Sequence, residues 1–154
     1  MRDYQIVSKI TVFEYEELSD EEKELIDVAR EMTLHSYAPY SHFYVGAALR
    51  LKNGVVVPGC NQENAASPAT ICAERSAIFG AGAQYPDQPV MSLAITACND
   101  NGFMQAPIPP CGTCRQVMKE FAPDLEVICL NGKGESKKFT LQELLPYSFD
   151  GSML

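Results

Sequence analysis

Three cysteine residues have positions that could hold a metal ion. Cys111 and Cys114 are three residues apart, so the first turn of a helix would bring both thiols to one side. A Cys-x-x-Cys pair alone could also be a redox pair, half of a structural zinc site or two buried side chains. Cys72 is a third thiol, at the start of the preceding predicted helix. If a right-handed crossover connects the two segments, both helix N-termini lie at one sheet edge and the three thiols can converge.

Three thiolates without an obvious fourth protein ligand match a zinc site with one open position, which catalysis requires and a purely structural site does not. The fourth ligand would be water. Because three thiolates donate much negative charge to zinc, such a site needs compensation. Two helix N-termini supply partial positive charge, and the guanidinium of Arg75 can donate hydrogen bonds to thiolate sulfur. The sequence therefore favours a catalytic zinc centre held by Cys72, Cys111 and Cys114.

The elements that must position these thiols can be predicted from the patterning around them. A Ser-x-x-Glu capping box at Ser19 predicts a helix from Asp20 to Ser36. Alternation from Phe43 to Leu51, followed by Asn-Gly at 53–54 and three valines, predicts a β-hairpin. The remaining predictions are a strand or extended arm over 4–15, helices over 71–83 and 111–121, strands over 90–97 and 125–130, and a last short helix capped at Thr140. This order implies an α/β fold, a mixed sheet sandwiched between helices in three α/β/α layers.

Composition and charge limit the kinds of partner. The chain of 154 residues, 46% hydrophobic, is expected to form a single domain over 1–154, with residues 1–17 as an N-terminal arm or strand. A net charge of −8 disfavours nucleic acid and anionic membranes and is compatible with a small neutral substrate. No secretory signal and no membrane-spanning apolar run is visible. Six cysteines without such a signal are typical of a cytoplasmic protein with reduced thiols.

Residues 72–75 (Cys-Ala-Glu-Arg) and 110–114 (Pro-Cys-Gly-Thr-Cys) resemble the signature of the zinc-dependent cytidine deaminases, a family with small homotetrameric members. The similarity extends to residues 39–48 (Pro-Tyr-Ser-His-Phe-Tyr-Val-Gly-Ala-Ala), 59–65 (Gly-Cys-Asn-Gln-Glu-Asn-Ala) and 145–149 (Leu-Pro-Tyr-Ser-Phe). It spans roughly Leu18 to Phe149 and leaves the N-terminal arm outside. The chain departs from the family pattern at Ser67, where an aromatic residue is usual, and after Phe149, where Asp-Gly replaces Gly-Pro.

The resemblance implies a role for each residue of the site. By position alone, Glu74 would be a first-turn carboxylate that stabilises a helix N-terminus. In the family reading it is the catalytic proton carrier, which passes a proton from the zinc water to N3 of cytosine and supplies one to the departing amine. Arg75 would support the thiolates. Substrate contacts are implied for Phe43, Asn61, Glu63, Ala73 and Phe149, with Asn61 and Glu63 hydrogen-bonding the ribose hydroxyls.

The resemblance thus implies a Zn²⁺-dependent hydrolase that converts cytidine and deoxycytidine to the uridine nucleosides and ammonia, as a homotetramer with shared active sites. One alternative is a deaminase of another cytosine nucleoside, such as blasticidin S. A second is a structural zinc-binding interaction module, which predicts a closed fourth ligand and leaves Glu74 without a role. Nucleic-acid editing is disfavoured by the acidic charge and by the lack of a basic stripe.

Overall fold

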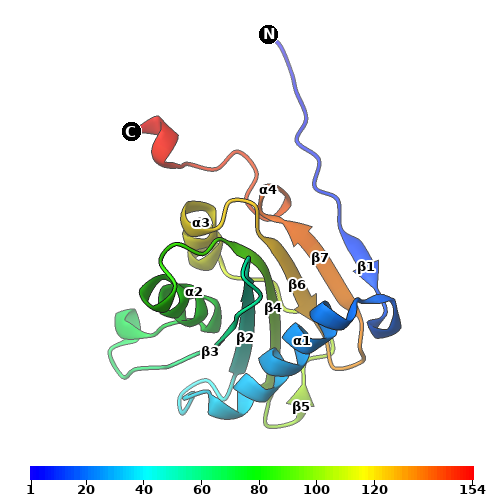
Figure 1. Cartoon of the computed structure of the whole chain (residues 1–154), viewed down its shortest axis with the longest axis vertical. Helices are drawn as coiled ribbons and strands as arrows, with labels where there is room; N and C mark the ends of the chain where they lie inside the picture. The colour runs from blue at the N-terminus through cyan, green and yellow to red at the C-terminus, as the bar shows by residue number, and fades with distance from the viewer.

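The computed structural model describes residues 1–154, and a seven-stranded mixed sheet forms its centre (Figure 1). The strand order is β1-β7-β6-β4-β2-β3, and the short β5 pairs with β4. Only β4 and β6 are parallel, and every other pairing is antiparallel. The strands are β1 (Thr11–Phe13), β2 (Tyr44–Leu51), β3 (Val56–Cys60), β4 (Val90–Asn99), β5 (Gly102–Phe103), β6 (Glu126–Leu130) and β7 (Ser136–Thr140).

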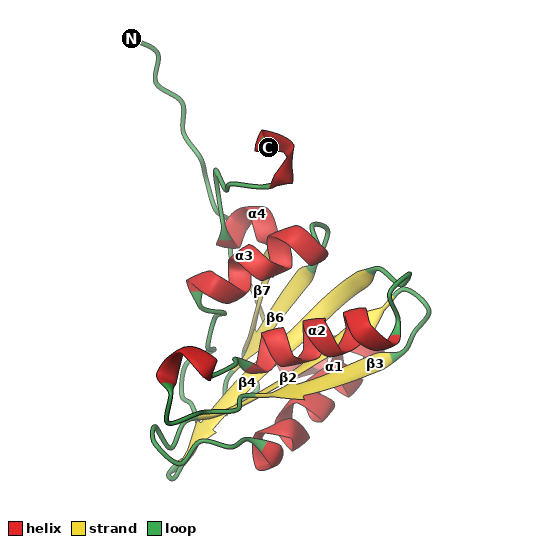
Figure 2. Ribbon diagram, turned by 90° about the vertical axis from the view of Figure 1, so that its left-hand side faces the viewer, coloured by secondary structure: helices red, strands yellow, loops and turns green.

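Helices cover both faces of this sheet (Figure 2). They are α1 (Asp20–Met32), α2 (Ala73–Gln84), α3 (Gly112–Phe121) and the single turn α4 (Leu141–Leu144). Helices α2, α3 and α4 share one hydrophobic core with the sheet, and α1 packs into a second core on the opposite face. The predicted α/β/α arrangement is therefore confirmed.

Helix α1 lies close to the sheet because β2 has a glycine beneath it. The Ser19 hydroxyl accepts a hydrogen bond from the Glu22 amide at 3.2 Å and begins the helix as predicted. A Cβ atom on Gly46 would lie only 1.9 Å from the carbonyl oxygen of Ala29. The helix ends at Met32, four residues before the predicted end, and residues 33–35 continue as a 3₁₀ turn.

The predictions missed β7 and overestimated the first strand. Residues 136–140 have no clean alternation, yet they form a strand because they complete pairings with both β6 and β1. The Asn131 side chain shapes the turn that leads to β7, since its Oδ1 accepts hydrogen bonds from the amides of Lys133 and Glu135 at 2.9 and 3.0 Å. Of the arm predicted over 4–15, only Thr11–Phe13 joins the sheet, and residues 1–10 extend along the surface and away from it (Figure 1).

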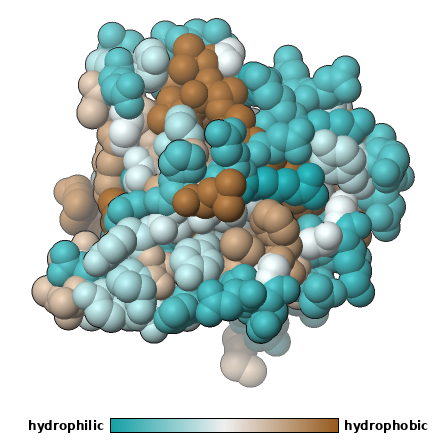
Figure 3. Space-filling view, turned by 90° about the horizontal axis from the view of Figure 1, so that it is seen from below, coloured by the Kyte–Doolittle hydropathy of each residue, from teal (hydrophilic) through white to brown (hydrophobic).

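The surface at the β5 end of the molecule is mostly hydrophilic, with apolar atoms gathered in separate patches (Figure 3). The longest helix has 13 residues, and none combines the length and the apolar character needed to cross a bilayer.

The close approach at Gly46 predicts a position that cannot tolerate a side chain. We expect Gly46→Ala to lower the free energy of unfolding by at least about 1 to 3 kcal/mol, because the new methyl group would push α1 off the sheet. The control is Gly82→Ala in α2, where a Cβ would meet no atom within 4 Å. That change should be neutral or stabilising by about 0.5 to 1 kcal/mol. Urea denaturation measures both, and equal stability of the two variants would contradict the packing explanation.

Candidate active site

The N-termini of α2 and α3 bring three thiols together at one edge of the sheet. Cys72 immediately precedes α2, Cys111 immediately precedes α3, and Cys114 lies in the first turn of α3. Their sulfur atoms all lie within 4.8 Å of one another, and those of Cys72 and Cys111 are 3.9 Å apart. Zinc with Zn–S bonds of about 2.3 Å places tetrahedral sulfur ligands about 3.8 Å apart. The cluster therefore has the donor atoms and nearly the spacing that zinc requires.

The sheet topology explains this convergence. Strands β3 and β4 both run antiparallel to β2, so they are parallel to each other; α2 follows β3, and α3 follows β4 after the short β5 and a loop. Helices that follow parallel strands begin at the same edge of a sheet. The first turn of α2 also approaches β3 closely, since a Cβ atom on Gly59 would lie 2.4 Å from the carbonyl oxygen of Ala73. Cys72 is thereby held against the sheet edge.

Positive charge next to Cys72 favours the ionised form of its thiol. Arg75 places Nη2 3.6 Å from Cys72 Sγ and 3.4 Å from the carbonyl oxygen of Thr70. Hydrogen bonding, first from Cys114 and then from Arg75, lowers the pKa of Cys72 to about 5. A thiolate is therefore present at neutral pH, as zinc binding requires. The predicted supporting position of Arg75 agrees with this geometry.

Glu74 lies beside the thiols but is not one of the clustered ligands. Its side chain is buried, with 4% relative exposure, and lines the same pocket as Cys72 and Cys111. Burial raises the pKa of Glu74 to about 7. A carboxyl group with this pKa can either accept or release a proton near neutral pH, which suits a general acid-base group.

A pocket of about 310 Å³ opens in front of these residues. Its wall is largely apolar, with Phe43 at one side and the sequential pair Ile108 and Pro109 at another. Polar groups enter it from Asn61 and Glu63. The volume is at the small end of the range for sites that bind small molecules.

The Asn61 side chain connects the start of β2 to the end of β3. Its Nδ2 donates a hydrogen bond to the carbonyl oxygen of Phe43 at 2.9 Å, and its Oδ1 accepts one from the amide of Val45 at 2.8 Å. Both ends of the amide thus hold the backbone on either side of Tyr44. Asn61 fixes the edge of the pocket at which Phe43 lies, whatever contact it also makes with a substrate.

Glu63 holds the loop that precedes β2. Its Oε2 accepts hydrogen bonds from the amides of Tyr40 and Ser41 at 2.9 and 3.3 Å, and its Oε1 accepts one from the Ser41 hydroxyl. The Ser41 hydrogen bond lowers the pKa of Glu63, so the side chain is a carboxylate at neutral pH. A carboxylate at a pocket mouth is a good acceptor for hydroxyl groups of a ligand.

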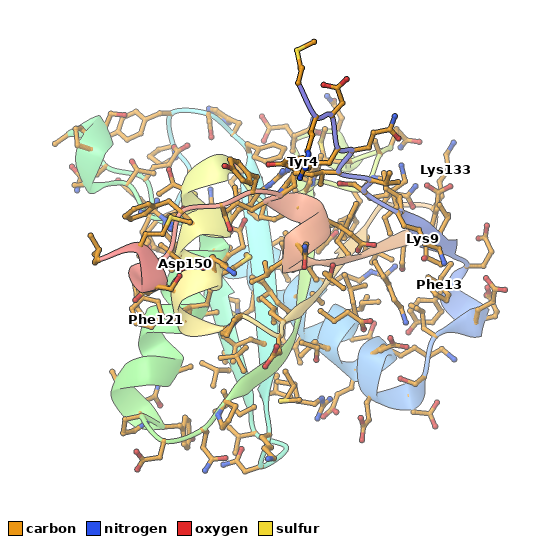
Figure 4. The ribbon with its side chains drawn as sticks, turned by 90° about the horizontal axis from the view of Figure 1, so that it is seen from above. Tyr4, Lys9, Phe13, Phe121, Lys133 and Asp150 are labelled. Carbon is orange, nitrogen blue, oxygen red and sulfur yellow. The ribbon has the colours of Figure 1, made fainter.

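The other two predicted substrate residues, Ala73 and Phe149, do not line the pocket of their own chain. The Ala73 side chain is fully buried in the core, so any contact of this residue with a substrate would have to come from its backbone. Phe149 lies outside its own chain's pocket, and its side chain is 56% exposed. Its carbonyl oxygen accepts a hydrogen bond from Gln116 at 3.1 Å, and the adjacent Asp150 pairs with Lys119 at 3.4 Å, which places this C-terminal segment over α3 (Figure 4).

Some site residues were not among those predicted. Ser41 positions Glu63, and its place in the 39–48 motif was an available signal. Ile108 and Pro109 form part of the pocket wall, but they lie in a loop whose path no sequence pattern predicts. The three cysteines outside the cluster differ in burial, since Cys60 and Cys129 are buried whereas Cys98 is partly exposed.

Comparisons with known proteins agree with this site. Residues 19–130 match the zinc-binding region of cytidine and deoxycytidylate deaminases. Cytidine deaminase from Halalkalibacterium halodurans is 43% identical over 126 residues, which are 81% of this chain and 91% of that protein. The crystal structure of cytidine deaminase from Burkholderia pseudomallei superposes with a TM-score of 0.73 at 42% identity, over 82% of this chain and 97% of that one. Blasticidin-S deaminase from Bacillus cereus is more distant, at 29% identity over 86% of this chain and 94% of that protein.

The thiol cluster predicts which cysteines retain metal. We expect the purified protein to hold one zinc per chain and Cys114→Ala to lose most of it, because two thiolates cannot replace three. The control is Cys60→Ala, which removes a buried thiol outside the cluster. Elemental analysis after dialysis measures the metal. Full zinc occupancy in Cys114→Ala would mean that the ligands are other residues.

Proposed function

Because this chain belongs to the zinc-binding family of cytidine and deoxycytidylate deaminases, it is a zinc-dependent hydrolase with cytidine deaminase activity, and we propose that it acts on both cytidine and deoxycytidine. The reaction takes up one water and yields the uridine nucleoside and ammonia. The observation that carries this function is a buried carboxylate, Glu74, beside three converging thiols in one pocket.

Cys72, Cys111 and Cys114 would hold the zinc ion. When bound, zinc supplies Lewis acidity, which lowers the pKa of water at its open position to near neutrality. The Arg75 guanidinium offsets part of the thiolate charge and thereby preserves that acidity. The protein residues thus prepare the site before a substrate arrives.

Glu74 moves the protons. As a carboxylate it takes a proton from the attacking water and delivers it to N3 of the cytosine ring. After the water oxygen has bonded to C4, Glu74 takes the remaining hydroxyl proton and passes it to the exocyclic amine; the C4–N bond then breaks, C4 becomes a carbonyl and ammonia leaves. Its burial keeps bulk water from competing for these protons and holds its pKa in the range that both transfers need.

The pocket edge selects a nucleoside. Glu63 accepts a hydrogen bond from a ribose hydroxyl, which replaces the Ser41 hydroxyl at Oε1 in the free protein. Asn61 retains one amide hydrogen and one acceptor lone pair beyond its two backbone contacts, and these reach the sugar. Phe43 packs against the substrate at the apolar wall. The backbone of Ala73 completes the contacts to the base.

A second candidate substrate is another cytosine nucleoside, such as blasticidin S. It is supported by the likeness to the Bacillus cereus protein, which covers nearly all of that chain at lower identity. The higher identity to the Halalkalibacterium halodurans protein favours the ordinary nucleoside. Parallel absorbance assays with cytidine, deoxycytidine and blasticidin S distinguish the two.

A homotetramer with shared active sites is the assembly that this account favours. Phe79 of α2 and Phe121 of α3 form an edge-to-face pair with ring centroids 5.9 Å apart, and both remain substantially exposed. Such a surface suits contact with a second copy of the chain. In this assembly, Phe149 reaches the pocket of a neighbouring subunit.

The six cysteines form no disulfide, which supports a cytoplasmic location.

The proposed role of Glu74 as proton carrier predicts the effect of replacing its carboxylate with an amide. We expect Glu74→Gln to keep its zinc and bind cytidine while turnover falls at least about 10²-fold, because shape is retained and the proton carrier is lost. The control is Glu120→Gln, an exposed carboxylate on α3. Metal analysis and steady-state kinetics test both variants. Near-normal turnover in zinc-loaded Glu74→Gln would refute the mechanism.

The sugar contact predicts a difference between nucleoside and base. We expect Glu63→Gln to lower kcat/KM for cytidine about tenfold or more and to leave the low kcat/KM for free cytosine unchanged, because only the nucleoside donates to this carboxylate. Competition between the two substrates, measured by chromatography, gives the ratio directly. An equal loss for both substrates would return Glu63 to a purely structural role.

The shared site predicts a separate effect at the C-terminus. Light scattering should give a mass of four chains, and Phe149→Ala should raise KM about 2- to 10-fold through the loss of one aromatic contact. The matched control is Tyr147→Ala, which removes an exposed ring from the same segment. A fully active monomer would exclude the shared site, and an unaltered KM in Phe149→Ala would remove Phe149 from it.

A further inference from the structure

A second hollow, of about 320 Å³, lies next to the candidate active site and shares only Pro109 with it. One wall comes from the N-terminal arm through Ser8 and Ile10. Another comes from Lys137 and Phe139 of β7, with Arg115 of α3 beside them. None of the residues proposed for catalysis or substrate binding lines this hollow.

Two cations face this hollow without a carboxylate partner. Arg115 donates from Nε to the carbonyl oxygen of Pro110 at 2.8 Å and from Nη1 to that of Leu144 at 2.7 Å. These neutral acceptors fix the guanidinium but leave its charge uncompensated, and Nη2 has no protein acceptor. Lys137 also forms no ion pair, although the chain has a net charge of −8.

Both positive groups lie at the same part of the hollow. Lys137 is paired in register with Cys129 of β6, which also lines it. Burial raises the pKa of the Cys129 thiol to about 12, and the charges of Arg115 and Lys137 act on it in the opposite direction. The lining has one acidic residue, Glu143, whose Oε2 accepts a hydrogen bond from the Thr140 amide at 2.7 Å and which forms no ion pair with Arg115 or Lys137.

The arm that closes this hollow lies outside the region matched by the family. The Ser8 hydroxyl donates to the carbonyl oxygen of Glu143 at 3.0 Å and ties the arm to α4. Ile10 then lines the hollow from the arm, together with the apolar side chains of Phe139, Pro107 and Pro109. The hollow therefore combines two cations at one part with apolar side chains around them.

We propose that this hollow binds a small organic anion, a carboxylate or phosphate monoester attached to an apolar group. The anionic oxygens lie between Arg115 and Lys137. Both side chains donate hydrogen bonds to them, and such charge-assisted hydrogen bonds are stronger than those between neutral groups. The apolar group packs against Ile10 and Phe139. Because Arg115 also holds the carbonyl of Pro110, directly before Cys111, such a ligand contacts the loop that leads to the metal cluster without entering the nucleoside pocket.

The test is a calorimetric titration of the zinc-loaded full chain. Phenyl phosphate and benzoate represent the two kinds of anion, and benzyl alcohol is the neutral control. We expect at least one of the anions to bind at one site per chain, with no measurable binding of benzyl alcohol. Lys137→Gln should weaken anion binding at least tenfold. Lys133→Gln, the same change at an exposed lysine at the margin of the molecule (Figure 4), should have no effect.

The proposal would be overturned by no saturable binding of either anion, by equal affinity in Lys137→Gln, or by loss of anion binding when excess uridine, which the enzyme does not consume, occupies the nucleoside pocket. Lys137→Arg, which keeps the charge, should retain binding. Ile10→Glu provides a second variant at a half-exposed position that tolerates a polar side chain. It places a negative charge in the wall, so undiminished anion affinity in this variant would also refute the proposed site.

Discussion

Three thiolates within a few ångströms of one another repel, and the structure depends on what offsets that repulsion. Zinc supplies most of the opposing charge, and two helix N-termini with the Arg75 guanidinium supply the rest. Both helices can begin at this point only because they follow parallel strands of one sheet. The sheet order and the close helix approach at Gly59 are therefore requirements of the metal centre.

The same arrangement gives two glutamates of one pocket, Glu74 and Glu63, different pKa values. Glu74 is buried against the thiols, and its pKa of about 7 lets it gain or lose a proton near neutral pH, whereas Glu63 accepts hydrogen bonds from a loop and stays ionised. These different surroundings fit the roles that we propose, proton transfer for Glu74 and recognition of hydroxyl groups for Glu63. Asn61 fixes the start of β2 at the edge of the same pocket.

Sequence patterns predicted the parts of the fold that local chemistry determines. The capping box at Ser19, the hairpin at 53–54 and the helix starts at Cys72 and Cys111 are formed by residues close together in the chain. Strand β7 depends on partners distant in sequence, and no alternation marks it. The backbone contacts of Asn61 and the position of Phe149 over α3 are likewise products of the folded structure. Family motifs indicated which residues matter, but their hydrogen-bond partners required coordinates.

The most direct test of the metal centre is zinc X-ray absorption spectroscopy of the purified protein. The account predicts a first shell of three sulfur atoms at about 2.3 Å and one lighter oxygen or nitrogen atom. It also predicts that the lighter atom changes its distance when a cytidine analogue occupies the pocket, while the sulfur shell stays the same. A shell of four sulfur atoms, or one with fewer than three, would contradict the open catalytic site.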